Sequence, residues 1–434
     1  MQPGLGVNNV RKMQLLSGFV VITMACSPPV PTSTPDSGED AGVAEVDGGS
    51  GDAGLFEIYR RDAGELVLDS GLPWTWAAVE QVISAPPASG SVTGRWIPVS
   101  PTSVDRAWAG GVLLLDGRVV AIPFNESSVL VINPATNTSE RWPITGGGVE
   151  EGWQGGVLLP DGKVIAFPRN AGRFLRIDPV ARTVTPFGDD LSDTGLAGGV
   201  DKFRGGVLGL NGQVYAAPSM ATFIARLDPA SGTVTRVPIP PTINRGRTQG
   251  AVLFPTGDIV MWPSFDMPGL LVIPGRQGVA DEVWLMPRPS VMGPPAFNAG
   301  GVVTGIEKAV APPHQNAMPL RYEAGRLTWD SPLPGVSPQA ANAWFFAAWS
   351  TNGHFYAAPF GQEQAIGFSL SGPPSLLPFD PGASIFRSVL GVVALPDGRV
   401  IGIPHARSAW LELSPAGRRT LPIEAFTSPY LNKL

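Results

Sequence analysis

The sequence predicts an all-β protein, a seven-bladed β-propeller with four-stranded antiparallel blades, and three observations lead to this prediction. The phrase "GGVLLPDGKVIAFP", Gly155 to Pro168, recurs as "GGVLLLDGRVVAIP", "GGVLGLNGQVYAAP" and "GVVALPDGRVIGIP". The proline that ends the phrase returns every 45 to 50 residues. The 434 residues include 54 glycines and 46 prolines, which favours many short strands and tight turns over long helices.

Each repeat begins with a β-hairpin. In the second copy, a strand from Gly155 to Pro160 leads through a two-residue turn, Asp161-Gly162, into a strand from Lys163 to Pro168. A variable loop follows, and then the segments "RFLRID" and "TVTPF" are expected to form the third and fourth strands. Four strands per repeat with no helical pattern are typical of a propeller blade.

Seven copies of the repeat predict seven blades. The repeated proline occurs at Pro123, Pro168, Pro218, Pro263, Pro313, Pro359 and Pro404. The first turn is less regular in copies four to six, where it becomes Thr256-Gly257, Glu307-Lys308 and Asn352-Gly353. The fifth copy is the only one without a turn glycine, so we expect its blade to be the least regular.

Small residues open the first strand of most copies. We expect this strand to line the central axis, where neighbouring blades crowd most closely and only small residues fit. The pairs at this position are Gly110-Gly111, Gly155-Gly156, Gly205-Gly206, Gly250-Ala251, Gly300-Gly301, Phe346-Ala347 and Gly391-Val392.

The propeller, residues 92–434, also needs a strand that closes the ring. The segment "VTGRWIPV", Val92 to Val99, resembles the fourth strand of a blade and is expected to lie beside the last blade. The segment "GRRTLPI" near the chain's end also reads as a fourth strand, so the sequence leaves open which of the two is outermost. In the N-terminal extension, residues 57–91, only "WAAVEQVI" reads as a short amphipathic element.

The repeats resemble those of the wider β-propeller superfamily, particularly the NHL, YVTN and kelch-like groups and the propeller lipoproteins of Gram-negative bacteria. The resemblance covers roughly residues 92 to 423 and carries no intact catalytic motif. It implies a propeller fold. Because this fold hosts binding proteins, lyases, hydrolases and oxidoreductases alike, function has to be argued from individual residues.

The N-terminal segment resembles a bacterial lipoprotein signal. Residues 1–25 combine a basic pair with a short apolar run, and the small residue Ala25 precedes Cys26, the only cysteine. We expect lipidation of Cys26 and a place in the bacterial cell envelope, in the outer membrane facing the periplasm or exposed at the surface. Thr23 departs from the usual leucine, and the alternative is an ordinary signal peptide. Residues 26–56, rich in Pro, Ser, Gly and Asp, are expected to form a disordered tether.

Charge and composition restrict the partners and cofactors. The formal net charge is −6 and no cluster of Lys and Arg occurs, so nucleic acid is not an expected partner. The inner strands carry no His or carboxylate that converges on a metal, and no phosphate-binding loop appears, so we expect neither metal nor cofactor. The chain is expected to be a monomer that contacts the membrane only through its lipid anchor.

Histidines are the candidate catalytic residues. His314 and His405 directly follow the repeated prolines of blades five and seven, whereas His354 follows a turn on the opposite face. In a propeller lyase similar to virginiamycin B lyase, such a histidine would act as general base with a nearby carboxylate, for which Glu126, Asp266 and Glu363 are at hand. The alternative, which we favour, is that both are ordinary loop residues.

Aromatic residues and one arginine are the candidate ligand-binding residues. Four blades carry an aromatic residue two positions before the inner strand: Trp108, Trp153, Phe203 and Trp344. If exposed, these rings would stack on sugars or anchor a protein; the favoured alternative is packing between blades. Arg204 is the only charge next to the paired glycines. The sequence thus predicts a non-enzymatic module that binds a protein or glycan, with an envelope lyase or hydrolase as the alternative.

Overall fold

The computed structural model describes residues 74–432, except for 102, 196–198, 244–245, 265–267, 276–278, 288–300, 314–317, 332–343, 358, 361–363, 370–374 and 378–387, and describes only the backbone of 375–377. The chain divides into two units, Met1–Glu57 and Ile58–Leu434, and every described residue belongs to the second.

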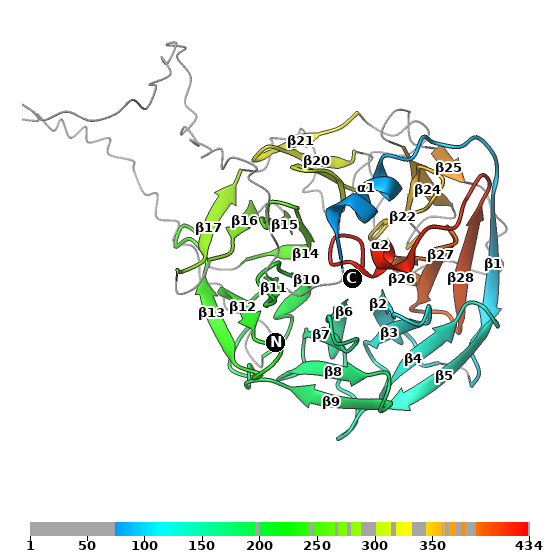
Figure 1. The fold of residues 1–434 in the computed structure, drawn as a ribbon. Helices are drawn as coiled ribbons and strands as arrows, with labels where there is room; N and C mark the ends of the chain where they lie inside the picture. Colours follow the sequence, from blue (N-terminus) through cyan, green and yellow to red (C-terminus); the bar gives the residue numbers. More distant parts are fainter. Residues whose placement is uncertain are drawn as a thin grey trace, which may run out of the picture. The chain divides into compact units, whose positions relative to one another are not determined.

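Seven four-stranded antiparallel sheets form a ring, which confirms the predicted fold (Figure 1). Blade 1 consists of β2 (Trp108–Leu113), β3 (Val119–Pro123), β4 (Ser128–Asn133) and β5 (Thr138–Pro143). Blade 2 consists of β6 (Trp153–Leu158), β7 (Val164–Pro168), β8 (Phe174–Asp178) and β9 (Thr183–Phe187). Blade 3 consists of β10 (Phe203–Leu208), β11 (Val214–Pro218), β12 (Phe223–Leu227) and β13 (Val234–Pro238).

The other blades follow the same order, and the shortest strands occur in blade 6 rather than in the fifth, which the sequence singled out as least regular. Blade 4 consists of β14 (Thr248–Leu253), β15 (Ile259–Pro263), β16 (Gly269–Ile273) and β17 (Glu282–Met286). Blade 5 consists of β18 (Val302–Gly305), β19 (Lys308–Ala311), β20 (Leu320–Glu323) and β21 (Arg326–Trp329). Blade 6 consists of β22 (Ala348–Trp349), β23 (Phe355–Ala357), β24 (Ala365–Phe368) and β25 (Ser375–Leu377). Blade 7 consists of β26 (Val389–Ala394), β27 (Val400–Pro404), β28 (Ala409–Pro415) and β1 (Val92–Pro98).

A β-bulge in the inner strand explains the paired glycines. In blade 1 the pairing of β2 with β3 shifts between Trp108 and Gly111, and Gly110 has a φ of +83°. The same shift occurs in blades 2, 3, 4 and 7. Neighbouring inner strands meet backbone to backbone there, because a Cβ added to Gly391 would lie 2.7 Å from the Cα of Gly110. The crowding inferred from the sequence is therefore present in the structure.

The Asp-Gly hairpins differ from the two-residue turns expected from the sequence. In blade 2, Gly162 N donates to Leu159 O, so that Pro160 and Asp161 are the central residues of the turn. Gly162 alone has positive φ, +83°, and Leu159 N donates to Lys163 O to close a three-residue loop. The sequence fits this geometry, since type I turns favour proline at the second position and glycine at the fourth.

The N-terminal strand closes the ring. All seven residues of β1 pair with β28, from Val92 opposite Pro415 to Pro98 opposite Ala409. Arg95 Nε lies 2.7 Å from Glu412 Oε1, and Glu412 is buried. The competing segment near the chain's end forms no strand and leads into α2 (Ile423–Thr427). The open question of which strand is outermost is thus answered in favour of β1.

Two short helices pack together over one end of the ring. The amphipathic stretch found in the sequence forms α1 (Trp76–Ile83). Trp74 Nε1 donates to Thr427 Oγ1 at 3.2 Å. Asn432 donates to and accepts from the backbone of Leu113, at 2.8 Å in both bonds, and so fixes the C-terminal segment to the inner strand β2. Figure 1 shows both helices near the centre of the ring.

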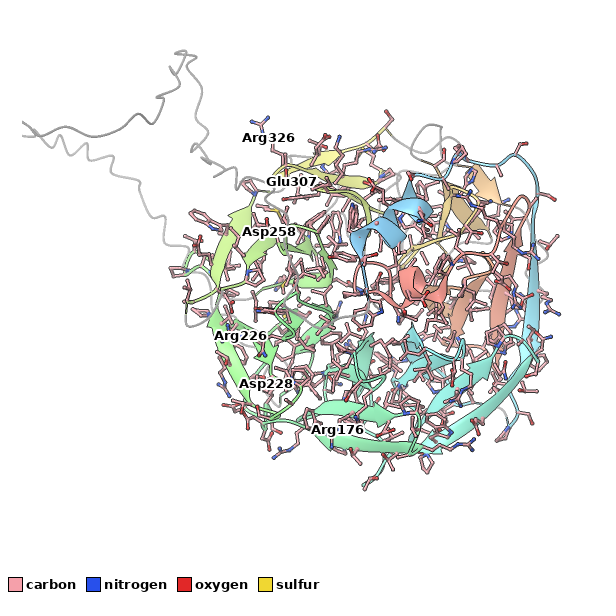
Figure 2. All side chains as sticks on the ribbon, in the orientation of Figure 1. Arg176, Arg226, Asp228, Asp258, Glu307 and Arg326 are labelled. Carbon is pink, nitrogen blue, oxygen red and sulfur yellow. The ribbon has the colours of Figure 1, made fainter. Side chains whose placement is uncertain are left out.

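The two ends of the ring therefore differ. We call the end with the hairpin turns and the two helices the turn face. We call the end with the loops between second and third strands, and with the connections from one blade to the next, the connection face. Charged side chains such as Arg176 on β8 and Arg226 on β12 lie toward the outer part of the ring (Figure 2). Arg226 Nη1 pairs at 2.8 Å with Asp281 Oδ2 and so links blade 3 to blade 4.

Candidate functional site

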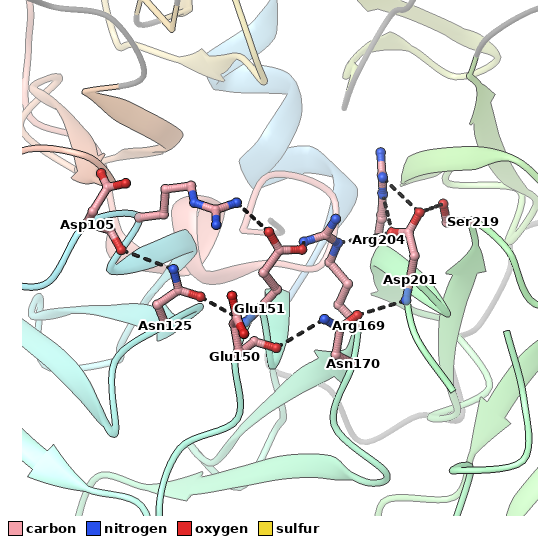
Figure 3. A network of polar contacts seen from close by, with 10 residues as sticks. Asp105, Asn125, Glu150, Glu151, Arg169, Asn170, Asp201, Arg204 and Ser219 are labelled. Atoms are coloured by element: carbon pink, nitrogen blue, oxygen red, sulfur yellow. Dashed lines mark hydrogen bonds and ion pairs between the residues drawn. The ribbon is translucent and has the colours of Figure 1, made fainter. Parts of the chain in front are cut away.

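A continuous ion-pair network crosses the connection face of blades 1 to 3 (Figure 3). Arg106 and Arg169 each donate to one carboxylate oxygen of Glu151. Arg169 Nε donates to Asp201 Oδ1 at 3.0 Å. Arg204 holds the same Asp201 through two bonds, from Nε at 2.8 Å and from Nη2 at 2.9 Å. These five residues are called the arginine network below.

The network grows from a repeated and strained backbone position. Arg106, Glu151 and Asp201 each precede the inner strand of their blade by two residues, and their φ angles are +52°, +48° and +54°. Residues other than glycine rarely adopt this conformation. It is rarer for arginine and glutamate than for asparagine. Such strain persists only where the surroundings impose it and gathers at functional sites.

Two asparagines impose this conformation. Asn125 accepts from Glu151 N at 2.9 Å and donates to Asp105 O at 3.1 Å, which joins the connections before blades 1 and 2. Asn170 repeats the arrangement one blade further on, accepting from Asp201 N at 2.8 Å and donating to Glu150 O at 3.1 Å. The charged residues therefore stand on a fixed framework.

The arginines of the network keep Asp201 ionised. Burial alone would raise the pKa of Asp201, but the guanidinium groups of Arg204 and Arg169 outweigh that effect and hold this pKa below its ordinary value. Three guanidinium groups face two carboxylates, which leaves one positive charge in excess. The side chains are 13% to 32% exposed, so a ligand can reach them.

A buried lysine supports the same loops. Lys202 is fully buried, and its Nζ donates to Asn170 O at 3.1 Å and to Gly199 O. Burial lowers the pKa of Lys202 to about 8. Because both acceptors are backbone carbonyls, the side chain connects the loop of blade 2 to the connection before blade 3.

A further set of residues, one per blade, lies directly before the position that holds the bulge glycine in blades 1 to 4 and 7. We call this set the axial position. It holds Ala109, Gln154, Arg204, Gln249, Phe345 and Leu390, and its member Ala299 lies outside the described residues. Blades 2 to 4 thus present polar groups here, whereas blades 6, 7 and 1 present apolar ones. Arg204, the ligand-binding candidate from the sequence, belongs to both the axial position and the arginine network.

The four aromatic candidates are buried, so the exposed ring considered from the sequence is not formed. Trp108, Trp153, Phe203 and Trp344 are at most 2% exposed. Three of them are the first residue of the inner strand, and Trp344 forms an isolated β-bridge with Pro359. Each tryptophan donates its Nε1 to the carbonyl of the residue twenty positions later in the chain: Ser128, Arg173 and Gln364. Phe203 makes the matching contact with Phe223, at 5.9 Å between ring centroids. In these four blades the rings therefore connect the start of the first strand to the start of the third.

The histidines separate into three cases. His405 is 2% exposed, its Nδ1 lies 2.7 Å from Trp108 O, and its ring packs against Phe124 at 5.3 Å between centroids. Because a carbonyl can only accept, Nδ1 carries the proton. His314 lies outside the described residues, as do Asp266 and Glu363. His354 is half-buried beside the turn at Asn352, as expected from the sequence.

Glu126, the remaining acid considered as a partner for a histidine, is engaged elsewhere. It is buried, pairs with Arg141 Nη1 at 3.2 Å and accepts from Val104 N at 3.0 Å. Within the described ranges, no group of three or more His, Cys, Asp or Glu side chains could hold a metal ion. Among the helices that are described, none is long and apolar enough to span a membrane.

The sequence reasoning missed most of the arginine network. Of its five residues, only Arg204 was among the candidates from the sequence. The signal was present, since aligning the blades places a charged residue two positions before the inner strand in three successive copies. The asparagines at positions 125 and 170, one residue after Phe124 and Arg169, are a second such signal.

Comparisons with known proteins support the fold and leave function open. No protein-family model and no curated protein matches the sequence. Virginiamycin B lyase from Staphylococcus aureus is similar in structure, with a TM-score of 0.60 and 12% identity over 75% of this chain and 99% of that one. A catalytically inactive histidine-to-alanine variant of that lyase with quinupristin gives a TM-score of 0.57 at 12% identity, over the same shares. The extracellular domain of a one-component system from B. thetaiotaomicron gives 0.54 at 10% identity, over 74% of this chain and 40% of that chain.

Proposed function

We propose that this protein is a non-enzymatic binding module that recognises a protein or glycan through the connection face of blades 1 to 3. The observation that carries the proposal is the arginine network, five charged side chains from three blades, of which Arg106, Glu151 and Asp201 lie on strained backbone. Side chains fixed before a ligand arrives lose little entropy on binding, which favours recognition.

The state of the acids favours binding over catalysis. A general base needs a carboxylate whose pKa lies near the working pH, whereas the pKa of Asp201 is held low by two arginines. Both carboxylate oxygens of Glu151 are already engaged, one by Arg106 and the other by Arg169. The excess positive charge suits an anionic or strongly hydrogen-bonding group on the partner.

Replacing Arg106 and Arg169 together by methionine is expected to weaken ligand capture about tenfold or more, since charge-assisted hydrogen bonds are lost. The measurement is retention of envelope proteins and glycans by the immobilised propeller, with thermal unfolding as a check on folding. Arg182→Met is the matched control, because Arg182 lies in a turn, is 62% exposed and, among the described residues, forms an ion pair with Glu140 alone. Equal retention by the double variant and the control would contradict the proposal.

A lyase is the second candidate, and His405 is the observation that favours it. This histidine has one ring nitrogen fixed as a donor and lies on the loop that follows β27. Solved structures of similar fold include a lyase that is inactive as a histidine variant. Incubation with quinupristin distinguishes the two functions: we expect no turnover, whereas turnover that is lost in His405→Asn would establish the lyase instead.

We also propose that Cys26 carries a lipid and that residues 26–56 tether the propeller to an envelope membrane. The support is the position of the chain's only cysteine after a short apolar run. Several acyl chains hold a protein firmly, so Cys26→Ser is expected to shift the protein from the membrane fraction to the soluble fraction or to leave it unprocessed. An unlipidated mature N-terminus in the unaltered protein, read by mass spectrometry, would contradict this.

A further inference from the structure

We propose that Gln154, Arg204 and Gln249 form a subsite for the terminal carboxylate of a peptide chain. This inference rests on the proposed function, because it names the group that the connection face recognises. It adds two glutamines that take no part in the arginine network, and it assigns a part of the site to one chemical group.

The three residues are neighbours because of the fold. They occupy the axial position of blades 2, 3 and 4, each directly before a bulge glycine with positive φ: Gly155, Gly205 and Gly250. The inner strands β6, β10 and β14 contact one another in that order. A Cβ added to Gly205 would lie 3.4 Å from the Cα of Gly250, so the backbones that carry Arg204 and Gln249 nearly touch.

The two amides are buried and have unused hydrogen-bonding capacity. Gln154 is 5% exposed and Gln249 is 2% exposed, and no described residue donates to or accepts from either amide group. Neither is among the fully enclosed polar atoms without a partner, so both amides still reach solvent. A buried polar group without a partner costs free energy, and a ligand that supplies the partner recovers it.

Arg204 is oriented for the same ligand. Asp201 binds its Nε and Nη2, which fixes the plane of the guanidinium and leaves Nη1 without a bond to any described residue (Figure 3). A planar, oriented guanidinium on a strand between two strands that carry glutamine at the same position suits a carboxylate. The nearby Asp201 disfavours a doubly charged group such as a phosphate, because only one positive charge is in excess.

The apolar half of the axial position favours a peptide over an acidic sugar. Ala109 and Leu390 are buried there, so Phe345, which is partly exposed, supplies the accessible apolar surface, and its ring lies 4.6 Å from that of Phe360 between centroids. An apolar side chain beside a terminal carboxylate can pack on this ring. A uronic acid would instead place its hydroxyl groups against this apolar surface, where the hydroxyl groups would find no hydrogen-bond partner.

Calorimetric titration with N-acetyl-Ala-Ala-Leu tests the subsite. We expect the free acid to bind at least tenfold more tightly than the same peptide with a C-terminal amide, and more tightly than sodium glucuronate. Arg204→Met is expected to reduce acid binding at least tenfold. Gln249→Leu leaves the arginine network intact, so this variant tests the subsite even if Arg204→Met does not fold. We expect Gln249→Leu to reduce the affinity for the peptide acid at least threefold. Arg182→Met should bind as the unaltered protein does.

Equal binding of acid and amide, absence of acid binding, or a preference for glucuronate would each overturn the inference. These outcomes do not contradict the proposed function as long as replacing Arg106 and Arg169 together by methionine weakens ligand capture as predicted above. Conversely, capture that survives that double variant contradicts the proposed function even where the peptide acid binds. The two failures are therefore distinguishable.

Discussion

Replacing Gly391 by alanine is expected to destabilise the protein by at least about 3 kcal/mol, from a backbone conformation that alanine rarely adopts together with a steric clash. The φ of Gly391 is +108°, and an added Cβ would lie 2.7 Å from the Cα and 3.1 Å from the N of Gly110. Both of these are backbone atoms, which cannot rotate away as a side chain can. The clash falls where blade 7 meets blade 1, so relieving it would open the closed ring.

Gly117→Ala is the matched control for this prediction. Gly117 also has positive φ, +84°, but nothing lies within 4 Å of the position of its added Cβ. Its replacement is expected to cost only about 1 to 2 kcal/mol, the conformational part of the effect. Equilibrium unfolding in urea measures both variants. Equal losses would show that backbone conformation, rather than the contact between blades, requires the glycine.

The fold could be predicted because the repeats report directly on it. A bulge that brings backbones together favours glycine, so Gly110 and its counterparts mark the inner strand in every copy but the sixth, which has Phe346 there. The hairpin turns were located correctly and typed wrongly. Asp-Gly also suits a two-residue turn. The residue that distinguishes the two geometries is Pro160, which favours the second position of a type I turn.

The candidate site could be predicted only in part. Arg204 was found because it departs from the small and neutral residues around it. The sequence left two interpretations open for the aromatic residues. A tryptophan at the start of a strand looks the same in the sequence whether its Nε1 binds a ligand or donates to a backbone carbonyl, as Trp108 does to Ser128. Ion pairs such as that of Arg169 with Asp201 join residues from different blades, and their partners follow from the closed ring rather than from any local pattern.

Removal of β1 is expected to destabilise the propeller on the order of 4 kcal/mol, the sum of several backbone hydrogen bonds and the exposure of an edge. Without β1, all seven residues of β28 lose their outer partner. Glu412, which is 3% exposed, loses Arg95 and keeps Arg399 Nη1 at 2.7 Å as its remaining ion pair. An exposed strand edge also recruits other chains, so we expect aggregation as well as a lower unfolding temperature.

Three chains that begin at different residues isolate the effect of the strand. A chain that begins at Trp74 contains both α1 and β1. A chain that begins at Ser91 lacks α1 and contains β1, and a chain that begins at Asp105 lacks both elements. Because the first step removes the helix and the second removes the strand, each loss can be read separately by urea unfolding and light scattering. We expect the second step to lower stability more than the first, since β1 completes a sheet that otherwise has three strands. Equal unfolding midpoints for the chains from Ser91 and Asp105 would show that the ring closes without β1.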